Sequence, residues 1–405
     1  MTVASARIRR LLMVLLTAAL LFGAMATVNL QTADAAFPGD SDWIAFSGAD
    51  DAGTGDLEIW AVAADGSGSP VNLTANLFLE SDPAFSADGT KLAFARDIGG
   101  SSAIYVAAFN PSGPSLGTAR KISSGPIDGE PAWSPDGTMV AYQRKIVTTL
   151  ESGNADGADP ADLIDSTADF VAAGVRAGDT VKNLTDGSSG VATAVAPTVV
   201  TLAGGLSGGT LDAWAIGHGY TIERANRQIF KSPVNGSNLA GTLLSQPGSE
   251  LLYTDQEPVW SPDGALIAFT STEDDSNSDI FTMSAADGSS RTNLTDTSTF
   301  DNAASRPSWS PDGGRIALQS AEPNVPDHNI WTISKTGGSP DQVTGASVTG
   351  ADNDLEPAWS PDGSQIAFRR SDTGGNKLFV INANGSGNAT RVGSGSAPAT
   401  NSKPD

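Results

Sequence analysis

Four acidic pairs with the pattern acid-x-acid-Pro recur along the 405-residue chain. They are Glu80/Asp82, Asp128/Glu130, Asp255/Glu257 and Asp354/Glu356. Residues two apart in an extended segment point to the same side, so both carboxylates of each pair should contribute to one acidic rim. Such a rim could bind a cationic group of a protein or peptide, and two of its carboxylates could act as the acid and base that cleave a glycosidic bond.

A fifth copy of the pattern lacks both acids and has Ala304 and Arg306 in their places. Arg306 is the only base at its position, so we expect it to interrupt the negative rim and to orient a bound partner. Recurrence of the acids also favours a structural role, such as accepting backbone N–H bonds. The sequence thus predicts partner-binding residues at five positions, which are Asp82, Glu130, Glu257, Arg306 and Glu356.

Other residue types with catalytic or metal-binding chemistry are scarce. The chain has no Cys and only two His, His218 and His328, which excludes disulfides and a His-rich metal site. Gly205–Gly209 matches G-x-S-x-G literally but lacks a strand-elbow-helix context. Asp275–Asp279 begins like a calcium loop without the turn Gly and the final Glu, so calcium stays open. We expect no catalytic residue, no metal site, no cofactor and no enzymatic activity.

The acidic pairs belong to a longer repeat, E-P-x-W-S-P-D-G followed by an apolar run. The motif aromatics are spaced by 48, 127, 49 and 50 residues, and they are Phe85, Trp133, Trp260, Trp309 and Trp359. Pro-x-Trp-Ser predicts an extended segment and Ser-Pro-Asp-Gly a turn. Third and fourth short apolar runs follow, as at 280–283 and 294–295. A period near 50 residues with four short strands is typical of a propeller blade, and the Trp should pack between blades.

The fold class that follows is all-β: a six-bladed β-propeller closed by a carboxyl-terminal strand. The first unit lacks its innermost strand, and residues 396–405, through Ala397–Thr400, are expected to supply it and close the ring. The long interval predicts a small inserted β module at 147–224. The propeller should therefore comprise residues 37–146 and 225–395.

The repeat unit W-S-P-D-G / I-A-F / I-Y-V / L-T resembles the TolB-type propeller repeat, which also occurs in the propellers of prolyl oligopeptidase-like enzymes. The resemblance covers the chain from residue 37 except for the insertion and the last few residues. It implies an exported, non-enzymatic propeller that binds other proteins at the channel mouth. No α/β-hydrolase domain follows the repeats, and the additional amino-terminal domain of TolB is lacking.

The amino terminus and the overall charge bear on where the protein acts. Arg7, Arg9 and Arg10 precede an apolar run from Leu11 to about Met25 and a small-residue site at Ala33–Ala35, which predicts a cleavable signal peptide over 1–36. The net charge of −23 disfavours nucleic acid and anionic membranes as partners. We expect a secreted or periplasmic monomer with no membrane span in its mature form.

These observations favour an exported, non-catalytic scaffold that binds a protein or peptide at the channel mouth. The alternative is a carbohydrate-binding or carbohydrate-active propeller that uses the rim carboxylates. The loop that carries the insertion and the connections that carry the acidic pairs should share one face of the propeller, with the insertion as a flank of the binding surface.

Overall fold

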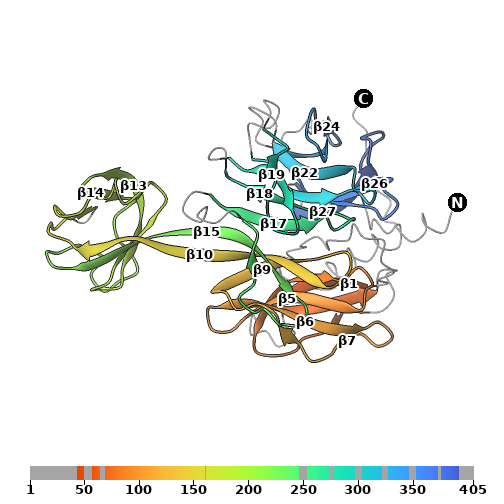
Figure 1. The fold of residues 1–405 in the computed structure, drawn as a ribbon, viewed down its shortest axis with the longest axis horizontal. Helices are drawn as coiled ribbons and strands as arrows, with labels where there is room; N and C mark the ends of the chain where they lie inside the picture. Colours follow the sequence, from red (N-terminus) through yellow and green to blue (C-terminus); the bar gives the residue numbers. More distant parts are fainter. Residues whose placement is uncertain are drawn as a thin grey trace. The chain divides into compact units, whose positions relative to one another are not determined.

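The computed structural model of the chain describes residues 43–49, 57–63, 69–159, 161–245, 253–273, 277–296, 303–321, 327–345, 353–372 and 375–391. These residues form strands, turns and loops, with no helix among them (Figure 1). The predicted signal peptide at 1–36 and the predicted closing strand at 396–405 lie outside the described residues. Closure of the ring and the number of blades therefore stay predictions.

Each copy of the repeat folds as an antiparallel sheet in which strands follow one another in sequence order. Three copies form separate four-stranded sheets. Their strands are β17 (Asp255–Trp260), β18 (Leu266–Ser271), β19 (Asp279–Ser284) and β20 (Thr292–Asn293); β21 (Ser305–Trp309), β22 (Arg315–Ala321), β23 (His328–Ser334) and β24 (Asp341–Gln342); β25 (Asn353–Trp359), β26 (Gln365–Asp372), β27 (Gly375–Asn382) and β28 (Thr390–Arg391).

The first repeat has three described strands, as expected for a unit without its innermost strand. These are β1 (Trp43–Ala49), β2 (Leu57–Ala63) and β3 (Val71–Asn72), and they pair in that order.

The second and third repeats belong to one thirteen-stranded sheet because β6 and β9 are joined through a single parallel pairing, Ser102 with Ile127. The strands of the second are β4 (Leu79–Phe85), β5 (Lys91–Asp97), β6 (Ser102–Asn110), β7 (Ser115–Leu116) and β8 (Arg120–Lys121). Those of the third are β9 (Ile127–Trp133), β10 (Met139–Asn154), β15 (Gly219–Pro233) and β16 (Thr242–Leu243).

The four Ser-Pro-Asp-Gly turns and the Ser-Ala-Asp-Gly turn at Ser86–Gly89 have the same geometry. In each turn the Ser hydroxyl donates a hydrogen bond of 2.6–2.7 Å to the Asp carboxylate two residues later. The Gly has a φ between 65° and 72°, which only Gly adopts readily. The bond from Ser86 lowers the pKa of Asp88 to about 2. Each turn is therefore locked by its own side chains, and the predicted hairpins are confirmed.

The motif tryptophans pack between adjacent repeats, as predicted. Trp133 in β9 is buried and donates from Nε1 to the carbonyl of Ala84 in β4, at 2.8 Å. Trp309 in β21 does the same to Val259 in β17, at 3.3 Å. No sheet could bury these side chains alone, so burial of the Trp requires the neighbouring repeat.

A second compact unit comprises residues Lys145–Arg227 and Gly248–Tyr253, and the sequence predicted a module at 147–224. β10 and β15 run from the first unit into this one and continue the sheet through β12 (Thr180–Asn183), β13 (Ser189–Ala196), β14 (Val199–Leu202) and β11 (Asp162–Ile164). Phe170, Val181, Val200, Tyr220 and Ile222 belong to a core of its own. The unit therefore has an apolar core separate from that of the repeats.

Candidate functional site

The second residue of each acidic pair, and Arg306 at the equivalent place, has a left-handed backbone. The φ angles lie between 49° and 58° at Asp82, Glu130, Glu257, Arg306 and Glu356. Residues with a Cβ rarely adopt this region, which costs on the order of 1 kcal/mol or more per residue. Strand register also shifts there, for example between Ser81 and Ala84 in β4 and between Gln256 and Val259 in β17. Four repeats therefore show a β-bulge at the left-handed residue and the Pro that follows it, in β4, β17, β21 and β25.

The bulge overturns the prediction that the two acids of a pair face the same way. That prediction assumed extended backbone through both residues, whereas the second acid is itself left-handed, which redirects its side chain. The first acids, Glu80, Asp128, Asp255 and Asp354, are almost fully buried and do not belong to an open rim. Only the second residues remain as candidates for binding.

Each buried first acid forms an ion pair with an arginine that also packs against aromatic rings. Arg144 contacts Asp128 through Nε at 2.6 Å and Nη2 at 2.9 Å, and its guanidinium lies 4.3 Å from the Phe230 ring centroid. The other pairs are Glu80/Arg96, Asp255/Arg291 and Asp354/Arg370. A buried carboxylate needs such a partner, so these acids have a structural role inside the sheet.

These arginines were missed from the sequence, although a signal was present. Arg96, Arg144 and Arg370 each follow the motif Phe or Trp by 11 residues. The fifth repeat, which lacks the acid, has Ser320 at that place beside Ala304. Acid and base are thus present together or absent together in these repeats. In the fourth repeat Arg291, which precedes β20, takes the role instead.

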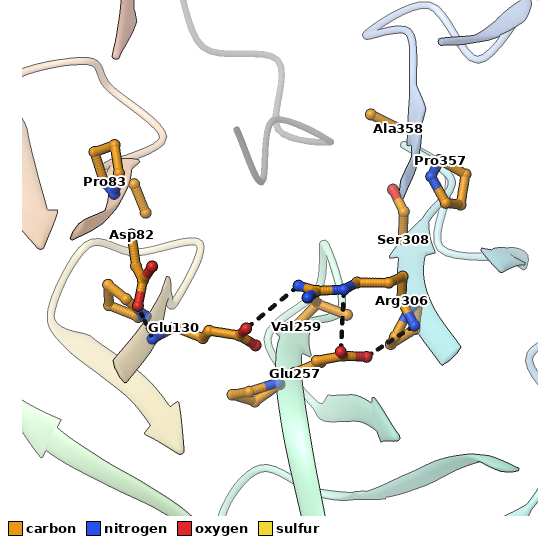
Figure 2. A pocket seen from close by; sticks show the side chains of 13 residues that line it. Asp82, Pro83, Glu130, Glu257, Val259, Arg306, Ser308, Pro357 and Ala358 are labelled. Atoms are coloured by element: carbon orange, nitrogen blue, oxygen red, sulfur yellow. Dashed lines mark hydrogen bonds and ion pairs between the residues drawn. The ribbon is translucent and has the colours of Figure 1, made fainter. Parts of the chain in front are cut away.

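One pocket in the first unit brings together four of the five predicted binding residues. Asp82, Glu130, Glu257 and Arg306 line it, with the prolines that follow them and with Val259, Ser308 and Ala358 (Figure 2). The space between them measures about 590 Å³, counting solvent at its open side. The charged residues come from four repeats and Ala358 from another repeat, so the pocket is the place where the bulged strands converge.

Arg306 joins two of the carboxylates of this pocket. Its Nε lies 3.0 Å from Glu257 Oε1 and its Nη1 lies 3.3 Å from Glu130 Oε1 (Figure 2). Burial disfavours the charged guanidinium, but the carboxylates of Glu257 and Glu130 outweigh this effect and raise the pKa of Arg306. Arg306 therefore interrupts the row of acidic residues by bridging the carboxylates of Glu130 and Glu257.

The same carboxylates accept backbone N–H bonds from the next repeat. Asp82 Oδ2 accepts from Glu130 N at 3.1 Å, and Glu257 Oε2 accepts from Arg306 N at 2.9 Å. The structural role that recurrence favoured is thereby confirmed at these two residues. Burial raises the pKa of Asp82, against the lowering effect of its hydrogen bond from Glu130 N and of the Arg306 charge.

Glu356, the fifth predicted residue, does not line the pocket. Its carboxylate pairs with Arg369, at 2.9 Å to Nε and 3.0 Å to Nη2. Its backbone N–H donates to Gln319 Oε1, at 2.7 Å, where the other repeats use a carboxylate. Glu356 still acts on the site through its charge, which helps to raise the pKa of Arg306.

Other candidates from the sequence have local structural contacts. Asp279, at the end of the partial calcium motif, accepts from the Thr295 hydroxyl at 2.6 Å. His218 Nδ1 lies 3.0 Å from the side-chain nitrogen of Asn183. Within the described ranges, His, Asp and Glu side chains form no group of three that could hold a metal ion. No helix in those ranges has the length and hydropathy to cross a membrane.

The strand order and the packing of Trp between sheets define the class of protein: an all-β propeller. No family model matches the sequence, and a search of the curated proteins finds no match. Among solved structures, a putative TolB from Agrobacterium tumefaciens aligns with 80% of this chain and 84% of its own, at 17% identity and a TM-score of 0.47. TolB from Acinetobacter baumannii aligns with 87% of this chain and 64% of its own, at 16% identity and a TM-score of 0.49.

Two enzymes share the fold at a slightly higher TM-score of 0.50. An oligogalacturonate lyase in complex with manganese is 15% identical, with 88% of this chain and 75% of its own chain aligned. A prolyl endopeptidase is 11% identical, with 95% of this chain aligned to 44% of its own. The sequence-based prediction that the protein is not an enzyme is therefore wrong, because enzymes occur among the propellers that this chain resembles.

Proposed function

We propose that the protein is an exported propeller that binds a protein or peptide partner at the pocket around Arg306. The observation that carries this proposal is the convergence of left-handed residues from four repeats on one partly open pocket. Strained backbone is retained most often where a site has to be held in a fixed geometry. The strain here places charged side chains, and not apolar ones, at the opening.

The charge of the pocket indicates which group of a partner would enter it. Asp82, Glu130 and Glu257 stand against the single base Arg306, so an excess of negative charge remains. The side chains of Glu130 and Arg306 are 17% and 32% exposed, so both can be reached from solvent. A lysine or arginine of the partner would complete the neutralisation that Arg306 begins.

A second candidate is a carbohydrate-active propeller. Glu130 and Glu257 contact the same guanidinium, so both carboxylates lie within reach of one bound molecule. Such a pair can serve as acid and base in glycoside chemistry. The lyase that shares the fold acts on oligogalacturonate.

Capture of a partner from cell-envelope extract tests the proposal with one matched pair of variants. Glu257→Gln keeps an oxygen for the Arg306 N–H but removes the charge, and should weaken capture about tenfold, as expected for one charged contact. Asp287→Asn removes a carboxylate beyond the other end of the strands, after β19, and should leave capture unchanged.

Equal capture by the Glu257→Gln variant and the wild-type chain would contradict the proposed site. Cleavage of oligogalacturonate by the wild-type chain, lost in Glu257→Gln, would favour the second candidate in its place.

A further inference from the structure

Apolar side chains gather on the surface of the second and third repeats, outside the pocket. Leu77 is 88% exposed, and the other members of this group are each more than a third exposed. We call this surface the apolar patch, and it consists of Leu77, Phe78, Leu79, Ile98 and Ile127. Single exposed apolar residues need no explanation, whereas a cluster of them on a folded surface marks an interaction site.

Strand pairing places the members of the patch along one row of paired residues, with two polar residues between Leu79 and Ile127. Leu79 pairs with Asp97, Asp97 pairs with Ser102, and Ser102 pairs with Ile127. This row crosses β4, β5, β6 and β9 and spans about 15 Å at the usual spacing of strands. Ile98 follows Asp97, and Leu77 and Phe78 precede Leu79, so all five residues border one row.

The loop that carries Leu77 is held in place and does not bury it. The Asn76 side chain donates to Glu80 at 2.9 Å and accepts from the Phe78 N–H at 2.7 Å. The Phe78 ring lies 5.2 Å from the guanidinium carbon of Arg96. The outward position of these side chains is therefore fixed by the loop itself.

The patch adjoins the pocket along the same two strands. Leu79 precedes Asp82 in β4 by three residues, and Ile127 precedes Glu130 in β9 by three residues. An extended strand advances about 10 Å over that distance. A short segment of a partner could therefore contact both surfaces at once.

A large apolar residue at the position of Leu79 and Ile127 occurs in these two repeats alone, although the fourth repeat has Leu252 and Tyr253 at the places of Leu77 and Phe78. At the position of Leu79 and Ile127 the other copies have Thr254, Ala303 and Asn353. The buried acid–arginine pairs occur in four repeats and support the fold, whereas the large apolar side chain at this position occurs in only two. The apolar residues of the patch consequently point to binding.

We propose that the apolar patch is the anchor of the partner site and takes an extended peptide segment of a partner protein. That segment presents two apolar side chains to the patch and a lysine or arginine, three or four residues away, to the pocket. This inference rests on the proposed function and adds the chemistry of the partner. The charge of the neighbouring pocket and the net charge of −23 both select a basic segment.

Other occupants fit less well. A sugar needs an open aromatic face, and Phe78, the aromatic member of the patch, already lies against Arg96. An anionic membrane surface would be repelled by the net charge of the chain. A peptide satisfies both the apolar and the acidic part of the surface.

A displayed library of random heptapeptides, selected against the immobilised full chain, tests the proposal. Enriched sequences should combine two apolar residues with a Lys or Arg three or four positions away. A fluorescein-labelled consensus peptide should bind the double variant Leu77→Ser/Ile127→Ser at least tenfold more weakly than the wild-type chain. Leu211→Ser, which alters an exposed leucine of the second unit, is the matched control and should bind normally.

The variants separate the two proposals. Unchanged binding to Leu77→Ser/Ile127→Ser with lost binding to Glu257→Gln would overturn the patch and leave the pocket in place. Lost binding to the double variant with unchanged binding to Glu257→Gln would overturn the pocket instead. An absence of enriched peptides would overturn the inference. Circular dichroism shows whether each variant is folded. Leu77, Ile127 and Leu211 are exposed, and Glu257→Gln keeps the size of the side chain and an oxygen for the Arg306 N–H, so all variants are expected to fold.

Discussion

At the scale of single residues, backbone conformation decides what each acid does. The sequence showed acids two positions apart, but their spacing does not reveal that the second one is left-handed. That conformation sends Glu130 to the pocket and leaves Asp128 buried with Arg144. Propensity arguments could not have found it, because Glu is not a residue that favours positive φ. The five candidate residues share a left-handed backbone, and four of them line one pocket. The extended geometry from which they were chosen is incorrect, and their part in binding stays a prediction.

Asp82 provides a test at this scale, because burial raises its pKa. A raised pKa means that the folded state disfavours the ionised carboxylate of Asp82. The ionised carboxylate therefore lowers the stability of the folded protein at any pH above the folded pKa. This loss of stability disappears as the pH falls below the ordinary value near 3.8. Asp82→Asn keeps an acceptor for the Glu130 N–H and tolerates positive φ. We expect it to raise the melting temperature at pH 7 and to change it little at pH 3.

Thermal unfolding followed by circular dichroism at the two pH values measures this difference. A melting temperature at pH 7 that is lower in Asp82→Asn than in the wild-type chain would show that the charge of Asp82 stabilises the fold, contrary to the account.

At the scale of elements, the hairpins and their turns could be predicted because the signal is local. Pro, Asp and Gly set the Ser-Pro-Asp-Gly turn within four residues, and the Trp is a large apolar side chain that must be covered. The arginine partners of the first acids lie on a different strand or turn, at positions such as Arg291 that the motif does not mark. Contacts of that kind depend on tertiary structure and were missed.

The fifth repeat suggests a test of the buried ion pairs. Asp354→Ala leaves Arg370, whose side chain is 20% exposed, without its buried partner, and should cost about 2 to 4 kcal/mol of unfolding free energy. The double variant Asp354→Ala/Arg370→Ser reproduces Ala304 and Ser320 of the fifth repeat and should recover most of that loss. Urea denaturation of the three chains measures the difference. Additive losses in the double variant would argue against a pair that acts as one unit.

At the scale of the whole molecule, the class of fold was predictable and the function was only partly so. Repeated motifs specify an all-β propeller, and solved structures of 11% and 15% identity share that fold. Such distant likeness carries no activity over to this chain. The exposed apolar residues Leu79 and Ile127 are not part of the repeated motif, so the repeat pattern does not mark them. The flanking role predicted for the insertion stays a prediction.

Site-specific photo-crosslinking tests the central proposal, partner binding at the pocket, most directly. A benzophenone amino acid replaces Ser308, which lines the pocket, or Thr138, which lies in the turn at the other end of β9. Each chain is then irradiated in envelope extract. We predict a discrete crosslinked partner from position 308, reduced when Glu257→Gln is added, and none from position 138. A partner crosslinked only from position 138 would place the binding surface at the opposite end of the strands and contradict the account.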